Sequence, residues 1–175
     1  MSHLYGLDLS MEQTGVTIFD LNALQPIHIG SITTNQKQSH GKRLYIIATE
    51  ILSLIEKYPP SIVTIERGFS RFNTSTQVIY RVHGLINYLL RDYEQIYYPP
   101  KTVKEAIIRG DASKKLVKDM IERKFPDVVF ENEDESDSFA VALTYLIKNK
   151  YIAWDKDGIK IAKKEREGSI GQSRR

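Results

Sequence analysis

Four carboxylates in this sequence stand at positions where their chemistry could be used. Asp8 lies inside the apolar segment 4–9, which is expected to be a buried strand, and a buried charge needs a partner or a task. Glu66 ends a second apolar segment, 61–66, and strand ends in open α/β sheets are where sites usually form. The alternative for each is a strand-end side chain that caps the adjacent turn.

Asp134 and Asp137 lie three positions apart, immediately before the apolar run 139–143. Residues at i and i+3 of a helix share a face, so both carboxylates could point at one ion while the apolar side chains behind them pack on a sheet. The alternative is that acidic residues simply favour a helix N-terminus. We interpret the other acids in this run as residues that simply favour a helix N-terminus; they are Glu131, Glu133 and Glu135.

If the fold brings the four carboxylates together, they predict a metal site. Carboxylates within a few Å of one another repel strongly unless cations compensate. The chain has no cysteine, and its four histidines, at 3, 28, 40 and 83, form no short-spaced ligand pair. Oxygen ligands alone favour Mg2+ or Mn2+, and two ions about 4 Å apart can serve both the attacking water and the leaving oxygen.

Ten secondary-structure elements are predicted to position these side chains. The strands are short apolar runs bounded by turn residues, and the helices show apolar residues at helical spacing. The predicted strands are 4–9, 15–19, 26–33, 61–66 and 95–98. The predicted helices are 42–56, 73–91, 102–109, 114–124 and 133–148.

This order of elements predicts an α/β fold built on a mixed five-stranded sheet. We expect three antiparallel strands, two parallel strands and helices on both faces, an order that RNase H-like folds share. At 175 residues the chain suits one domain. We assign that domain to residues 1–150 and regard 151–175 as a basic C-terminal extension.

Charge is distributed unevenly along the chain. The net charge is +3, with acidic residues concentrated at 131–137 and cations at 101–118 and 160–175. That pattern suits a protein that holds cations in one place and binds a polyanion around it, although basic runs can also be merely solvated faces. The N-terminus has the features of neither a signal peptide nor a membrane span, so we expect a cytoplasmic protein that contacts no membrane.

The motifs resemble those of the RuvC-type Holliday-junction resolvases from about residue 4 to residue 148. The segment 6–10, Gly-Leu-Asp-Leu-Ser, with Thr-Gly-Val at 14–16, resembles the first RuvC motif, and Ile-Glu-Arg-Gly-Phe at 65–69 resembles the second. The segment 98–120 is similar to the lysine-bearing region of the family. The segment 134–143 resembles its closing Asp-x-x-Asp-Ala-Leu-Ala stretch. Each motif alone is weak, but their order and spacing together are fairly specific.

The resemblance implies a homodimer that binds four-way DNA junctions and makes paired nicks with divalent metal. By position, it gives the catalytic and metal-binding places to Asp8, Glu66, Asp134 and Asp137. It gives DNA contacts to Phe69, which matches an aromatic residue that contacts junction bases, and to Lys104 and Lys114, which match cations near the scissile phosphate. We add Arg71, which lies beside Phe69 and Phe72, and Lys118 to the expected DNA contacts.

Two departures from the family pattern point to a bacteriophage-type member. Leu9-Ser10 follows the first aspartate, where cellular resolvases usually have Pro-Gly, and Ser138-Phe139 replaces the usual Ala-Leu. Such a member is expected to cut several branched DNA structures.

Two other functions stay open at this point. One is a noncatalytic binder of branched DNA, which would not need all four acids. The other is an ATP-handling protein of the actin or sugar-kinase group, because segment 8–15 loosely resembles the phosphate loop of that group. Proteins of that group need a second, similar lobe, for which this chain has too few residues.

The segment 73–91 offers the expected dimer contact. Its apolar residues include Val78, Val82, Leu85 and Leu89, and part of this set must cover the sheet. The rest, with Ile86 and Tyr80, could form a self-complementary contact with a second copy. The alternative is that every apolar residue faces the core of its own subunit. His83 is expected to be a core or interface residue rather than a metal ligand.

Overall fold

The computed structural model describes residues 2–68 and 73–156 and contains all ten predicted elements in the predicted order. The strands are β1 (His3–Asp8), β2 (Gln13–Asp20), β3 (Gln25–Thr33), β4 (Pro60–Glu66) and β5 (Glu94–Tyr98). The helices are α1 (His40–Lys57), α2 (Asn73–Leu89), α3 (Pro100–Ile107), α4 (Lys114–Lys124) and α5 (Glu133–Lys148).

The five strands form one mixed sheet in the order β3-β2-β1-β4-β5. The pairs β1–β2 and β2–β3 are antiparallel, whereas β1–β4 and β4–β5 are parallel. Because β1 and β4 run side by side in the same direction, their last residues, Asp8 and Glu66, reach the same edge of the sheet. The predicted sheet is therefore confirmed, and it brings the first two carboxylates together.

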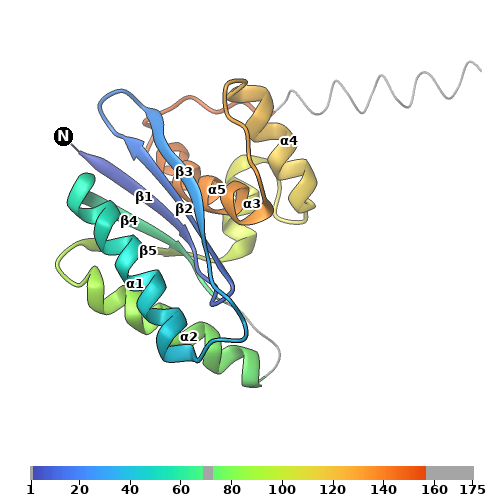
Figure 1. Ribbon diagram of the computed structural model, residues 1–175. Helices are drawn as coiled ribbons and strands as arrows, with labels where there is room; N and C mark the ends of the chain where they lie inside the picture. Colours follow the sequence, from blue (N-terminus) through green and yellow to red (C-terminus); the bar gives the residue numbers. More distant parts are fainter. Residues whose placement is uncertain (1, 69–72, 157–175) are drawn as a thin grey trace, which may run out of the picture.

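Helices cover both faces of the sheet, as expected (Figure 1). On one face, α1 and α2 pack through buried side chains such as Ile47 and Ile86. On the other face, α5 packs against the sheet and α3 and α4 pack around it, through residues such as Phe139 and Ile107. Within the described parts of the chain, no helix combines the length and the apolar character needed to cross a bilayer.

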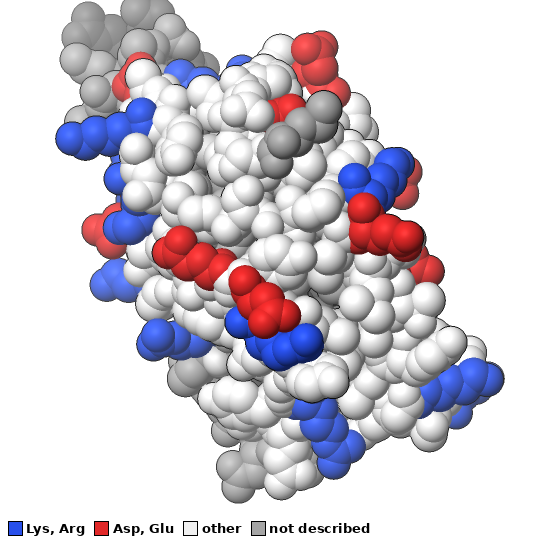
Figure 2. All heavy atoms as spheres, turned by 90° about the vertical axis from the view of Figure 1, so that its left-hand side faces the viewer, with Lys and Arg blue, Asp and Glu red and all other residues white. Residues whose placement is uncertain are grey.

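One outer face of the molecule carries charges of both signs (Figure 2). On the side seen at the left of Figure 1, Lys and Arg side chains of the described residues lie close to Asp and Glu side chains, with uncharged surface between the groups. A DNA-binding surface requires a concentration of positive charge. This mixed face is therefore not the one we expect to bind a polyanion.

Two glycines let α5 lie directly on the middle of the sheet. A Cβ atom at Gly6 would lie 2.3 Å from the backbone oxygen of Ser138, and one at Gly15 would lie 2.0 Å from the backbone oxygen of Asp134. Any larger residue would therefore push the helix away. A buried hydrogen bond of 2.9 Å between the hydroxyls of Thr17 and Ser138 joins β2 to α5 at the same level. The first turns of α5 are thus held beside the end of β1.

Part of the prediction for α2 was wrong. Val82 and Ile86 are fully buried, because their four-residue spacing places them on the helix face that covers the sheet. Neither can lie on a surface that contacts a second copy. The exposed large side chains of α2 are Tyr80, which is 62% exposed, and Tyr88, which is 66% exposed. His83 is buried, as expected of a core residue.

The first residues after α5 run back across α3. The Trp154 indole nitrogen donates a 2.8 Å hydrogen bond to the backbone oxygen of Ile107, and its ring stacks on that of Phe125 with centroids 6.5 Å apart. Residues 157–175, most of the basic extension, lie outside the described part of the chain. The proposed domain boundary at residue 150 stays a prediction.

We expect Gly15→Ala to lower the free energy of unfolding by roughly 2–3 kcal/mol, because the added methyl group meets backbone that cannot move without lifting α5 from the sheet. Urea unfolding measures this change. Gly41→Ala is the matched control, because a Cβ atom at this position in α1 meets nothing within 4 Å. Equal stability of the two variants would contradict the close seating of α5.

Candidate active site

The four predicted carboxylates come from three elements that meet at one edge of the sheet. Asp8 ends β1 and Glu66 ends the adjacent parallel strand β4. Asp134 and Asp137 lie in the first turns of α5, whose backbone touches Gly15, the residue paired with Asp8 in β2. The fold therefore places the helical pair beside the two strand ends.

The rest of the acidic run fixes the start of α5. The Asn132 side chain accepts a 3.0 Å hydrogen bond from the backbone nitrogen of Glu135, and it donates one of 3.0 Å to the hydroxyl of Ser31 in β3. The buried carboxylate of Glu135 accepts a 2.7 Å bond from the backbone nitrogen of Glu131. Asn132 thus caps the helix and Glu135 fixes the backbone just before it, which agrees with the interpretation of Glu135 as a helix N-terminal residue.

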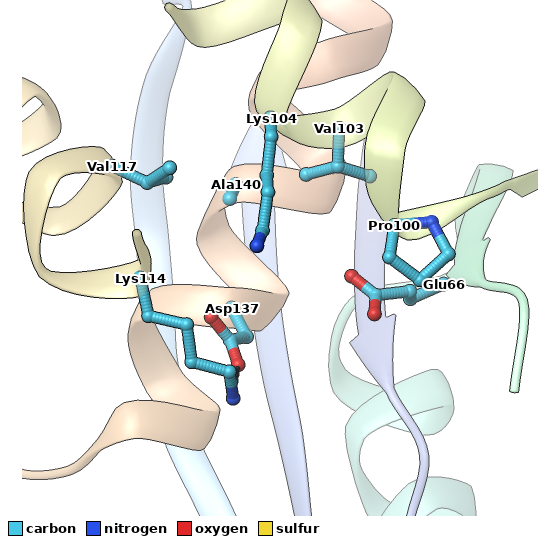
Figure 3. A pocket seen from close by; sticks show the side chains of 8 residues that line it. All are labelled: Glu66, Pro100, Val103, Lys104, Lys114, Val117, Asp137 and Ala140. Carbon is cyan, nitrogen blue, oxygen red and sulfur yellow. Dashed lines mark hydrogen bonds and ion pairs between the residues drawn. The ribbon is translucent and has the colours of Figure 1, made fainter. Parts of the chain in front are cut away.

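A pocket of about 120 Å³ opens between two of the four predicted carboxylates, Glu66 and Asp137, and two lysines, whereas Asp8 and Asp134 do not line it. Figure 3 shows Lys114 beside Asp137 on one side, Glu66 near Pro100 on the other, and the Lys104 side chain directed into the space between them. The remaining lining residues are Val103, Val117 and Ala140. The pocket therefore combines acidic oxygens and ammonium groups within an otherwise apolar wall.

The carboxylates influence one another electrostatically. Burial raises the pKa of Asp8 to about 7, and the negative charges of Asp137 and Asp134 add to the shift. Burial raises the pKa of Glu66 to about 8, and the charges of Asp8 and Asp137 add to it. The pKa of Asp134 is also raised, first by burial and then by Asp137, against the opposing effect of a hydrogen bond to its own backbone. Each shift shows a need for positive charge at this edge.

Lys114 supplies part of that positive charge. Its ammonium nitrogen donates a 2.6 Å hydrogen bond to Oδ2 of Asp137 and lies 3.6 Å from Oε2 of Glu133. Burial works to lower the pKa of Lys114, but the hydrogen bond and the charge of Asp137 outweigh it and the pKa is raised. Ser113 caps α4 by accepting a bond from the backbone nitrogen of Leu116, which fixes the backbone from which Lys114 extends.

The donor chemistry of the site fits a hard divalent cation. Its ligand atoms are carboxylate oxygens, and the pKa values of Asp8 and Glu66 are raised by burial first and then by neighbouring negative charges, which a bound cation would offset. Among the described residues, however, no three acidic or histidine side chains are gathered tightly enough to hold an ion as they lie. Ligation would therefore require some of these side chains to rotate.

The predicted DNA contacts divide into three groups. Lys104 and Lys114 line the pocket. Lys118 lies one turn further along α4, where it is 3.6 Å from Glu122 and 5.9 Å from the ring of Phe130, and it is not a lining residue. Phe69 and Arg71 lie outside the described residues.

Sequence reasoning missed the supports of the site. Ala140 lines the pocket one helical turn after Asp137, and this i+3 spacing could have identified it. The bond between Asn132 and Ser31 and the bond between Thr17 and Ser138 join residues more than 100 positions apart. No local pattern signals such pairs.

Comparison with known proteins identifies the family. The family described as "Crossover junction endodeoxyribonuclease RuvC" matches residues 4–145. The chain belongs to the RuvC family. The RuvC of Caldanaerobacter subterraneus subsp. tengcongensis is 31% identical over 146 residues, covering 79% of this chain and 87% of the relative. The RuvC of Brachyspira hyodysenteriae is 30% identical over 151 residues, covering 83% of this chain and 94% of the relative.

A solved RuvC structure has the same fold. The structure described as T. thermophilus RuvC in complex with Holliday junction substrate matches with a TM-score of 0.75 and 18% identity, covering 86% of this chain and 96% of that one. The predicted RNase H-like fold is confirmed, and so is the class of enzyme: this RuvC-family member is a metal-dependent endodeoxyribonuclease. The comparisons do not favour the noncatalytic binder or the ATP-handling protein. The bacteriophage-type assignment stays a prediction.

Chelator-treated protein is expected to lose stability as pH rises from about 5 to 8. In the unfolded chain Asp and Glu titrate near pH 4, whereas folded Asp8 and Glu66 keep their protons until about pH 7 and 8. The folded state therefore binds more protons in this window, so its added stability is complete below pH 4 and is lost as pH passes the folded pKa values. Asp8→Asn removes one such group and should be more stable than wild type at pH 8 by more than about 1 kcal/mol.

Urea unfolding at several pH values, with EDTA present, measures this difference. Asp127→Asn removes an exposed acid and is the control, whose stability should run parallel to that of wild type. If the stability of Asp8→Asn also ran parallel to that of wild type across these pH values, Asp8 would not destabilise the folded protein at high pH.

Proposed function

We propose that this protein resolves four-way DNA junctions, and other branched DNA in the cytoplasm, by metal-dependent phosphodiester hydrolysis through paired nicks. Asp8, Glu66, Asp134 and Asp137 are its catalytic carboxylates and would hold Mg2+ or Mn2+, as two ions per site. The observation that carries the proposal is that three elements bring these four acids to one sheet edge, where burial, and after it the charges of neighbouring acids, raises the pKa values of Asp8, Glu66 and Asp134. The solved relative named above in complex with a Holliday junction supports the choice of substrate.

The carboxylates and the lysine of the site have different tasks in this proposal. A bound divalent cation supplies Lewis-acid stabilisation of the phosphate and activates water. The four carboxylates hold the cation, and the two strand-end acids are fixed by the sheet while the helical pair is fixed by α5. Lys104, directed into the pocket, offers an ammonium donor to a phosphate oxygen (Figure 3).

The wider DNA contact is also part of the proposal. Lys114 lies at the same pocket, and Lys118 follows it on α4. In this proposal the DNA lies on the side of the molecule where α3, α4 and α5 meet. Phe69 and Arg71, immediately after β4, are proposed to contact junction bases and phosphates.

Asp8→Asn and Glu66→Gln are each expected to slow junction cleavage by ~10² or more, because each misplaces metal charge in the transition state. Junction binding should persist or improve, since repulsion toward phosphate falls. Cleavage of a labelled four-way junction with Mg2+ or Mn2+, together with a gel-shift assay in Ca2+, separates the two effects. Asp127→Asn, which removes an exposed acid that does not line the pocket, should cut normally. Near-normal cutting by either site variant would refute the assignment.

Lys104→Ala and Lys114→Ala should also slow cleavage, because each removes a cation from the pocket that would hold the scissile phosphate. Binding should weaken less than catalysis, since a single lysine contributes little to a large polyanion contact. Single-turnover rates and junction affinities measured at one fixed salt concentration test this. Lys115→Ala is the control, because Lys115 is exposed on the same helix and does not line the pocket. If both pocket variants cut like the control, these lysines are only solvated.

We also propose that the protein is a homodimer with two-fold symmetry, since two symmetric nicks need two sites. The outer face of α2 supports this, because Tyr80, Gly84 and Tyr88 are exposed at four-residue spacing and Gly84 has open space around it. Two large rings around a glycine suit close contact with the same helix of a second copy.

Tyr80→Glu is expected to weaken the dimer, because it places a charge in the proposed contact while leaving the buried face of α2 intact. Sedimentation at micromolar concentration measures the change. Val129→Glu, on a loop beyond α4 where Val129 is 79% exposed, is the control. A wild-type protein that stays monomeric even with junction DNA bound would overturn the dimer proposal.

A further inference from the structure

The ion pair between Lys114 and Asp137 is the shortest contact in the active site. The ammonium nitrogen lies 2.6 Å from Oδ2 of Asp137, whose side chain is 19% exposed. Lys104 lines the same pocket but forms no ion pair with any described residue. The two lysines therefore have different relations to the carboxylates, although both are cations at one site (Figure 3).

A lysine so placed takes up the same oxygen that a metal ion would need. An ammonium group at hydrogen-bond distance fills the space in front of the carboxylate oxygen, and an ion bound to that oxygen would meet it at close range. Two cations at that separation repel strongly. Asp137 can therefore serve Lys114 or a metal ion through Oδ2, but not both.

Lys114 also has the freedom to leave. It is the first residue of α4, its side chain is 57% exposed, and its flexible stem extends from a backbone position that the Ser113 cap keeps fixed. The pocket of about 120 Å³ that it lines gives its ammonium group another place to lie, next to Lys104 and Glu66.

We propose that Lys114 is a tethered counter-cation of the active site, which competes with the divalent metal for Asp137 and is released toward the substrate phosphate when the metal binds. This inference rests on the proposed metal-dependent function. It assigns Lys114 two successive partners: Asp137 before the metal binds and DNA afterwards. Metal loading would then free a phosphate-binding group, so that the site gains its full affinity for DNA only when it is able to cut.

Isothermal titration of Mn2+ into the protein, without DNA and at low ionic strength, tests the competition. Lys114→Met should bind Mn2+ roughly tenfold more tightly than wild type, because the ion no longer has to displace an ammonium group from a half-buried carboxylate. Lys114→Gln should behave in the same way. Lys114→Arg retains the competing charge and should bind Mn2+ much as wild type does.

Two further variants separate competition for Asp137 from a general effect of charge. Lys104→Met removes a cation from the same pocket without breaking an ion pair, and Lys115→Met removes one from the same helix outside the pocket. Both are expected to change Mn2+ affinity much less than Lys114→Met. The metal-dependent rise in melting temperature should follow the same order.

The possible results lead to distinct conclusions. Equal Mn2+ affinity of wild type and Lys114→Met overturns this inference and leaves the proposed function standing. A gain in Lys104→Met as large as that in Lys114→Met also overturns it, since charge alone would then explain the effect. If the wild-type protein binds no Mn2+, the proposed metal site is overturned, and this inference with it. The same conclusion follows if the Asp8→Asn variant binds Mn2+ as tightly as wild type does.

Discussion

The close seating of α5 on the centre of the sheet is the constraint on which the rest of the structure depends. Gly6 and Gly15 remove the side chains that would otherwise separate helix and strands, and the hydroxyls of Thr17 and Ser138 join the two layers. Half of the acids stand on strands and half on this helix. Their spacing is therefore set by backbone contact between the layers, which is stiffer than any contact between flexible side chains.

The energetic consequence is that the sheet edge holding the four acids is destabilising by itself. Burial and mutual repulsion raise the pKa values of Asp8, Glu66 and Asp134, so the folded protein bears a cost for keeping these groups together. The extensive apolar layers on both faces of the sheet offset that cost. Lys114 offsets another part locally, since its charge acts on Asp8, Glu66 and Asp134 as well as on Asp137. A site that suits a doubly charged ion therefore lowers the stability of the folded protein locally while the ion is absent.

Sequence patterns were sufficient for the elements and the sheet, and the four acids they singled out lie at one edge of that sheet. Short β-branched runs and helical spacing depend on local periodicity, and a parallel pair of strands necessarily brings Asp8 and Glu66 to one edge. Which face of a helix is buried was harder to predict. The periodicity of α2 shows that one stripe is buried but not which apolar residues remain outside it, so Val82 and Ile86 were wrongly considered for the surface. The start of α3 was placed at residue 102, two residues late, although the proline at position 100 suits the first helical position.

The details of the site itself depend on distances that no one-dimensional pattern contains. Lys114 meets Asp137 only because α4 packs against α5, whereas the pairing of Lys118 with Glu122 follows from i,i+4 spacing within α4. The cap formed by Asn132 depends on a hydroxyl in β3, which the chain brings into place from 101 positions away. Such contacts arise only after the layers have packed, which is why residue types could suggest them but not assign them.

The position of Trp154 has a practical consequence. It is the only tryptophan of the chain, and its indole is bonded to the last turn of α3, the helix that carries Lys104, while its ring lies on Phe125 at the end of α4. An indole that loses a hydrogen bond and an aromatic neighbour changes its emission. The intrinsic fluorescence of this protein therefore reports, without any label, on the contacts of the indole with the two helices that bear the site's lysines.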